Sequence, residues 1–320
     1  MNMPKFVFTF VLILLYEYEV FAAINPPECG KRINEIRGKG LNKIVNGQIA
    51  DPEDWGWQVY VQYLSFDIQT KCGGSLINSQ WVLTAAHCVY NLEQNILPNP
   101  PLYKIYLGLH DETKEEDFTI ATEASKIILH PDYDDSKFQT EGLQNDIALI
   151  KLKESIKFND QILPVCLPES NSEFSNKMAW ATGWGRLDGN GASSKFLMEV
   201  NIPIYNDSYC TKKIAIKYNT KNSICGGGNN KGTCQGDSGG PLVVKDGDKW
   251  KLAGITSYAA VGCKNETVFA KTSAFIDWIK KTIQENSSSI PNATFTIINF
   301  STIFKKNFKF SAELKAQKSF

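Results

Sequence analysis

The chain has 320 residues, more than one average domain and fewer than three, so one large domain or two smaller ones are expected. A hydrophobic content of 42% with 21% charged residues is typical of a globular protein and argues against a fibrous or wholly disordered chain. The 34 basic residues cancel the 34 acidic ones, which excludes an overall basic surface for nucleic acid.

The N-terminus carries the pattern of a secretory signal. Lys5 precedes an apolar run from Phe6 to Tyr16, and Val20-Phe21-Ala22 offers a small-residue cleavage site. The alternative is a membrane anchor, but a run of about 11 residues is shorter than the roughly 20 that span a bilayer. The sequence therefore predicts a signal peptide over residues 1–22 and a secreted, extracellular protein.

The cysteines and sequons fit secretion. The chain has eight cysteines, an even number that predicts disulfides behind a signal peptide but leaves their pairing open. The N-x-[ST] sequons, which predict a glycoprotein, are at Asn206, Asn265, Asn286, Asn292 and Asn299.

Short apolar runs separated by Gly, Pro, Asn and Asp predict strands of a sandwich or barrel. Such runs lie at 58–63, 81–84, 147–152, 241–244 and 252–256. One helix is expected near the end, where Phe275, Trp278, Ile279 and Ile283 share a face and Ser273 is a candidate cap.

After Glu285 the composition changes to a tail with five basic residues and one acidic residue over 286–320. Its apolar portion is too short to span a membrane, so membrane contact through the tail is not expected. Binding to an anionic surface or a partner is the alternative to a processed extension.

Three motifs contain residue types used in nucleophilic catalysis. They are Leu83-Thr-Ala-Ala-His-Cys88, Asn145-Asp-Ile-Ala-Leu-Ile150 and Gly236-Asp-Ser-Gly-Gly-Pro241. Each alone has an ordinary explanation: a lone His as a side chain with satisfied hydrogen bonds, an Asp before a strand as a turn or cap, and a Ser among glycines as a turn. Together they follow the chain order His, Asp, Ser of the chymotrypsin fold.

On these motifs the sequence resembles the secreted serine endopeptidases of the chymotrypsin/trypsin/elastase family, over about residues 29–285. The resemblance implies an all-β fold of two six-stranded antiparallel β-barrels, with the active site between them and a C-terminal helix. It divides the chain into a signal peptide (1–22), an activation propeptide (23–43), a catalytic domain (44–285) and a basic, aromatic tail (286–320).

The resemblance also assigns catalytic roles. Ser238 is the expected nucleophile, His87 the base that activates it, and Asp146 the carboxylate that orients the imidazole. The backbone N–H groups of Gly236 and Ser238 are expected to form the oxyanion hole.

Lys43-Ile-Val-Asn-Gly47 resembles the activation site of the family. Cleavage after Lys43 by a trypsin-like protease would free the α-amino group of Ile44, which in the family pairs with the Asp before the catalytic Ser, here Asp237. An ordinary strand start is the alternative. The disulfide pairs implied by the resemblance are Cys29–Cys166, Cys72–Cys88, Cys210–Cys225 and Cys234–Cys263.

The pocket positions depart from trypsin. Gly232 stands where trypsin-like members carry an Asp, and Ser257, Ala259 and Thr267 form the expected walls. Side chains at both Ala259 and Thr267 narrow the slot, which predicts small or medium apolar P1 residues, as in elastases. The alternative is a basic or mixed P1 preference through Glu266.

The expected partners are protein or peptide substrates, the activating protease and protein protease inhibitors. No cofactor or metal is implied, because the calcium loop of the family looks shortened and Leu109 replaces its first ligand. A different class is a non-catalytic homologue that binds or regulates other proteins, although such proteins typically lack one of the three catalytic residues.

Overall fold

The computed structural model of the protein describes residues 24–33, 47–64, 69–90, 99–189, 191–259, 262–263 and 265–287. The predicted signal peptide, the cleavage site at Lys43 and Ile44, and the tail from residue 288 onward lie outside these residues.

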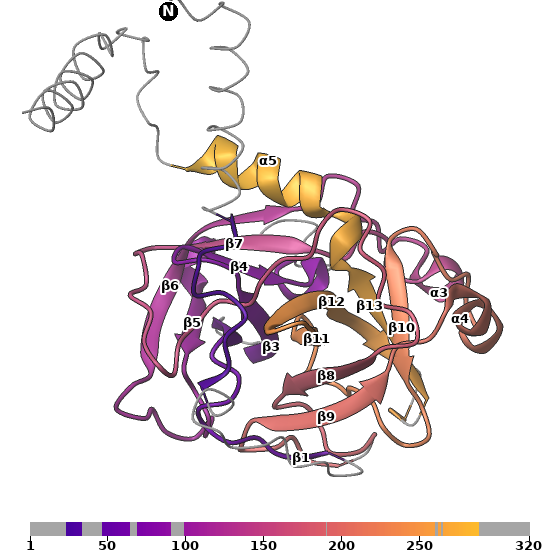
Figure 1. Ribbon diagram of the computed structural model, residues 1–320, viewed down its shortest axis with the longest axis horizontal. Coiled ribbons are helices and arrows are strands. Elements are labelled where there is room, and N and C mark those ends of the chain that lie inside the picture. The colour runs from indigo at the N-terminus through magenta and orange to yellow at the C-terminus, as the bar shows by residue number, and fades with distance from the viewer. Residues whose placement is uncertain are drawn as a thin grey trace, which may run out of the picture. The chain divides into compact units, whose positions relative to one another are not determined.

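Six antiparallel strands from the first half of the chain form a closed barrel, in the order β2-β3-β4-β7-β6-β5 (Figure 1). Its strands are β2 (Gln58–Leu64), β3 (Gln69–Leu76), β4 (Trp81–Thr84), β5 (Tyr103–Leu107), β6 (Ile120–Leu129) and β7 (Ala148–Leu152). Buried and partly exposed residues alternate along β5, so every second side chain faces the barrel interior. All four residues of β4 are buried, as expected for a short apolar strand in the middle of a core.

A second antiparallel sheet has seven strands, in the order β1-β9-β8-β11-β12-β13-β10. They are β1 (Gln48–Ile49), β8 (Met178–Gly183), β9 (Met198–Pro203), β10 (Ser223–Gly227), β11 (Pro241–Asp246), β12 (Lys249–Ala259) and β13 (Glu266–Lys271). A bridge between Ile204 and Gly226 brings the end of β9 back to β10, so the sheet curls toward closure. The all-β prediction is confirmed, and the second body contains the six expected strands, β8 to β13, plus β1 at its edge.

The described helices are short. The α-helices are α3 (Phe138–Glu141), α4 (Asp207–Lys213) and α5 (Ile276–Asn286), and the single 3-10 turns are η1 (Ala86–Cys88), η2 (Pro100–Leu102) and η3 (Thr272–Ala274). The predicted C-terminal helix is present as α5, but Ser273 does not cap it. Ser273 lies in η3, and its hydroxyl donates to the Ser172 carbonyl at 2.9 Å. Within the described ranges, none of the helices has the length and hydrophobicity of a bilayer-spanning segment.

Four disulfides staple the chain, and they are the pairs that the family resemblance implies. They join Cys29 to Cys166, Cys72 to Cys88, Cys210 to Cys225, and Cys234 to Cys263.

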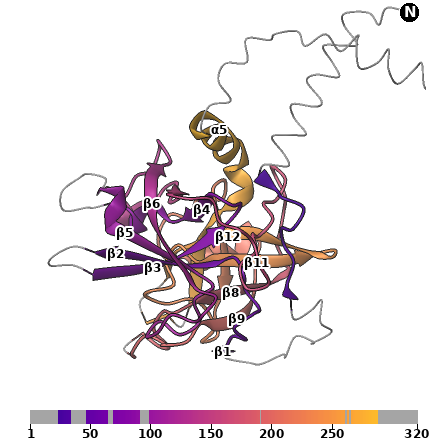
Figure 2. The same cartoon turned by 90° about the vertical axis from the view of Figure 1, so that its left-hand side faces the viewer.

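The backbone of the loop before β11 contacts β3 of the barrel directly. The Gly73 N–H donates to the Ser238 carbonyl at 2.7 Å, and a Cβ at Gly73 would lie 2.7 Å from the Gly240 Cα. Figure 2 shows β2 and β3 as adjacent strands, with β11 and β12 nearby. This backbone contact sets the loop of Ser238 against β3, which pairs with β4, the strand that leads to His87.

Candidate active site

Strand pairing brings His87 and Asp146 together. β4 pairs with β7 so that Thr84 lies opposite Ala148. His87 follows the end of β4 in η1, and Asp146 precedes the start of β7. In an antiparallel pair, the residues after one strand lie beside those before its neighbour. The His87 Nδ1 is accordingly 2.8 Å from the Asp146 Oδ2, and the His87 backbone N–H donates to Oδ1 at 2.9 Å.

This pair is electrostatically coupled. Burial alone would lower the pKa of His87, but the charge of Asp146 and its hydrogen bond outweigh burial and hold the pKa above 6.5. Burial alone would raise the pKa of Asp146, but the His87 charge and three hydrogen bonds keep it below its ordinary value. Asp146 is therefore ionised near neutral pH, and it favours the His87 tautomer that carries its proton on Nδ1.

Ser257 has a role that the sequence did not reveal. We expected Ser257 to line the substrate pocket, and its hydroxyl also donates to the Asp146 Oδ2 at 2.5 Å. The carboxylate is 1% exposed at its side chain, so this third bond satisfies a group that water does not reach. No local motif marks this contact, because the two residues are 111 positions apart.

Ser238 lies in the loop before β11, held against the barrel by the bond from Gly73 described above. A Cβ at the next residue, Gly239, would lie 3.1 Å from the Ala85 backbone nitrogen, which shows how closely the loop approaches the turn of His87. Among the described residues, the Ser238 hydroxyl makes no hydrogen bond to His87. Catalytic hydrogen bonds are often long without substrate and tighten when it binds.

The loop of Ser238 contains two backbone N–H groups that are available as donors. Within the described part of the chain, the N–H groups of Gly236 and Ser238 donate to no protein acceptor. Gly236 has a φ of +100°, and a Cβ there would lie 3.0 Å from the Gly185 Cα. This left-handed conformation suits glycine, and it leaves a pair of N–H donors with one residue between them.

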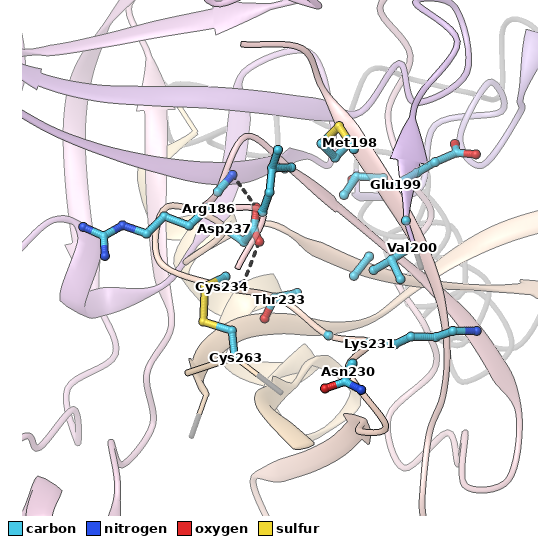
Figure 3. Close-up of a pocket in the computed structure, with 17 residues that line it drawn as sticks. Arg186, Met198, Glu199, Val200, Asn230, Lys231, Thr233, Cys234, Asp237 and Cys263 are labelled. Carbon is cyan, nitrogen blue, oxygen red and sulfur yellow. Dashed lines mark hydrogen bonds between the residues drawn. A yellow bond between two sulfur atoms is a disulfide. The ribbon is translucent and has the colours of Figure 1, made fainter. Parts of the chain in front are cut away.

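Asp237 borders a cavity of about 100 Å³. Its Oδ1 accepts from the Gly185 N–H and its Oδ2 from the Cys234 N–H, both at 2.8 Å. Figure 3 shows these two bonds, while the side chains of Arg186 and Lys231 extend away from the carboxylate. Desolvation raises the pKa of Asp237 to about 6, although the backbone bonds and the Lys71 charge act in the opposite direction.

The four expected pocket residues are close in the fold. Ser257 and Ala259 lie on β12, and Ala259 pairs with Thr267 of β13. A Cβ at Gly232 would lie 3.1 Å from the Thr267 Oγ1. The Thr267 hydroxyl also accepts from the N–H of Thr233 at 3.3 Å. Thr267 therefore occupies the space beside Gly232, where the pocket base is expected.

Glu266, the alternative charged group, is bonded elsewhere. Its carboxylate accepts a hydrogen bond from the Tyr209 hydroxyl at 2.7 Å. It lies 3.1 Å from where a Cβ on Gly228 would stand. The acidic loop near Leu109 is also internally bonded, because the Glu116 carboxylate accepts from the N–H groups of His110 and Asp111 at 3.3 and 3.0 Å.

The barrel carries the His–Asp pair, and the loop before β11 of the curled sheet places Ser238 beside it, an arrangement that is found in β-barrel serine proteases. The sequence model of the family described as Trypsin matches residues 44–279, which is most of the chain. The chain therefore belongs to the trypsin family of serine proteases, whose substrates are proteins.

Proposed function

We propose that the chain is the secreted zymogen of a serine endopeptidase that hydrolyses peptide bonds through an acyl-enzyme. The observation that carries this proposal is the bonded series Ser257–Asp146–His87, set beside the loop of Ser238. An ionised buried carboxylate on Nδ1 leaves the other imidazole nitrogen, Nε2, free to accept a proton.

In the proposed mechanism, the Ser238 oxygen attacks the carbonyl carbon of the substrate while His87 Nε2 takes its proton. Asp146 holds the ring in the correct tautomer and stabilises the imidazolium that forms. The N–H groups of Gly236 and Ser238 bind the tetrahedral oxyanion. His87 then protonates the leaving amine as the C–N bond breaks, and a water molecule releases the acyl group by the same steps in reverse order.

Activation is proposed to follow cleavage after Lys43. The new ammonium group of Ile44 would enter the cavity at Asp237 and pair with its carboxylate. Support comes from the raised pKa of Asp237, because a desolvated carboxyl with only backbone donors gains most from a cation. Gly47, three residues after Ile44, already lines this cavity.

The proposed P1 preference is for small or medium apolar residues. It is supported by the absence of a charge at Gly232, by Thr267 beside that glycine, and by Ala259 on the neighbouring strand. The hydrogen bond from Tyr209 holds the Glu266 carboxylate, which favours an apolar preference over a basic or mixed one.

The remaining parts of the proposal concern location and partners. Secretion is supported by the four disulfides, which persist in oxidising compartments. The sequon asparagines Asn206 and Asn265 are exposed and could carry glycans. A trypsin-like activator and protein inhibitors are the proposed partners besides substrates.

The test has two readouts on protein cleaved after Lys43. A fluorophosphonate probe should label the wild type and leave Ser238→Ala unlabelled. Peptide anilides with Ala, Val, Leu, Phe, Lys or Arg at P1 should then be cleaved fastest with Ala or Val. Preference for Lys or Arg would overturn the specificity proposal, and lack of labelling with a confirmed Ile44 terminus would favour the non-catalytic class.

A further inference from the structure

Residues 24–33, upstream of the predicted cleavage site, dock on the catalytic domain through more than their disulfide. The Gly30 N–H donates to the Pro164 carbonyl at 2.8 Å, and the Gly30 carbonyl accepts from the Trp250 N–H at 3.0 Å. The Lys249 ammonium donates to the carbonyls of Pro27 and Cys29 at 3.0 and 2.8 Å. Hydrogen bonds therefore hold the segment to the surface of the domain at several points along its length.

Arg32 is the buried end of this segment. Its side chain is 3% exposed, whereas the neighbouring Lys31 is exposed. The guanidinium carbon lies 4.2 Å from the ring centroid of Trp55 and 5.9 Å from that of Trp250. Arginine stacks on aromatic rings in this way because its charge is planar and weakly hydrated.

Two carboxylates complete the surroundings of the guanidinium. Arg32 forms an ion pair with Asp54, and its Nη2 is 3.7 Å from the Glu199 Oε2. Glu199 is 3% exposed and accepts from the Trp55 Nε1 at 2.6 Å. Burial raises the pKa of Glu199, and the charge of Arg32 opposes that rise. We call Asp54, Trp55, Glu199 and Trp250 the guanidinium cage.

The guanidinium of Arg32 should stabilise the cage strongly, because the cage contains buried carboxylates. Removing one partner of a buried ion pair leaves an uncompensated charge in a poorly solvated site. Here the guanidinium of Arg32 is shared by two carboxylates, those of Asp54 and Glu199. Figure 3 shows the Glu199 side chain directed away from Asp237.

We propose that residues 24–33 are a ligand of the catalytic domain, anchored by Arg32 in the guanidinium cage, and that they stay bound without the disulfide when the chain is cut between residues 33 and 47. The proposal rests on the proposed function only in that activation supplies the natural cut. A propeptide retained in this way becomes a second, light chain of the mature protein.

The experiment uses the full chain with Ser238→Ala, which prevents self-digestion, and with Cys29→Ser and Cys166→Ser. A recognition sequence for a site-specific protease is placed between residues 34 and 42. After cutting, gel filtration and mass spectrometry measure the fraction of protein that keeps the N-terminal fragment. Three further versions carry Arg32→Met, Arg32→Lys or, as the matched control, Lys31→Met.

The fragment should stay bound with Arg32 and with Lys31→Met, and Arg32→Met should release it on the order of a hundredfold faster. Arg32→Lys should release it faster than the parent, because an ammonium group cannot reproduce the planar stacking and pairing. Retention in all versions would show that Arg32 is not the anchor, and release from the parent would show that the disulfide alone holds the segment.

A second measurement covers variants that fold poorly without the disulfide. With Cys29 and Cys166 intact, hydrogen exchange at the N–H groups of Gly30 and Trp250 should be on the order of a hundredfold faster in Arg32→Met than in Lys31→Met after cutting. Equal exchange would overturn the proposal. Neither readout uses catalysis or the Lys43 site, so a failure of the proposed enzyme activity leaves both results interpretable.

Discussion

Replacing Asp237 with Asn tests the electrostatics of the cavity. In the described part of the uncut chain, Asp237 forms no ion pair, and desolvation raises its pKa from 3.8 to about 6. A carboxyl group whose pKa is higher in the folded state binds more protons there than in the unfolded state. The free energy of unfolding therefore falls as the pH rises from 3.8 through about 6.

The size of this effect follows from the two pKa values. A difference between 3.8 and about 6 corresponds to about 3 kcal/mol. Asn does not titrate, so its effect on the bonds to Gly185 and Cys234 is a constant offset. Relative to wild type, Asp237→Asn should therefore gain about 3 kcal/mol of stability between about pH 3.5 and pH 7.

The assay is urea unfolding of uncut protein at a series of pH values, in a Ser238→Ala background. Only the difference in stability between the protein with Asp237 and its Asp237→Asn variant is interpreted, which cancels the titration of other groups. A difference that stays flat over this range would refute the reasoning. After cleavage behind Lys43, the pairing ammonium should lower the pKa of Asp237, and the slope of the difference should reverse.

Three further predictions concern single contacts. Because Asp146 holds the pKa of His87 above 6.5, kcat/KM should fall as the pH drops through that pKa. Asp146→Asn should lower kcat by about 10⁴, the loss known for this change in the chymotrypsin fold. A pH–rate profile that is the same in the wild type and in Asp146→Asn would contradict this. Thr267→Gly should shift the P1 ratio of Phe to Ala upward by about tenfold or more in the anilide panel, and an unmoved ratio would mean that Thr267 does not limit the pocket. Gly30→Ala should cost about 1–3 kcal/mol in thermal unfolding, because φ is +68° and the new Cβ would lie 2.6 Å from the Trp250 carbonyl oxygen; an unchanged Tm would count against this packing.

The fold class could be predicted from the sequence because its signals are local. Short apolar runs bounded by turn residues are strands here, and the motif at His87 ends one strand while the motif at Asp146 begins its neighbour. The helix face at Phe275 and Ile279 is equally local. The prediction of Ser273 as its cap is wrong because a 3-10 turn intervenes, and sequence alone does not separate such a turn from a helix start.

The site contacts that could not be predicted join residues far apart in the chain. The bond from Tyr209 to Glu266 spans 57 positions, and the pairing of Arg32 with Glu199 joins the N-terminal segment to a strand of the second sheet. From the sequence, Arg32 looks like a solvated charge beside Lys31. Only the fold shows that it is buried against Trp55 and Trp250. Burial of this kind depends on tertiary packing, and neither the hydrophobic periodicity nor any short sequence motif predicts it.

The glycine contact between the two sheets has a mechanical consequence. At Gly73 and Gly240, backbone lies against backbone with no side chain between. The spacing between the serine loop and the barrel is thus set at this point by contact between backbone atoms and by the hydrogen bond from the Gly73 N–H to the Ser238 carbonyl. Substitutions that repack either core should therefore change the thermal stability of the protein more than the distance between the loop of Ser238 and the barrel. Thermal stability and the placement of the Ser238 loop can therefore respond separately to substitution, and Gly73 and Gly240 are the positions at which a single change would affect both.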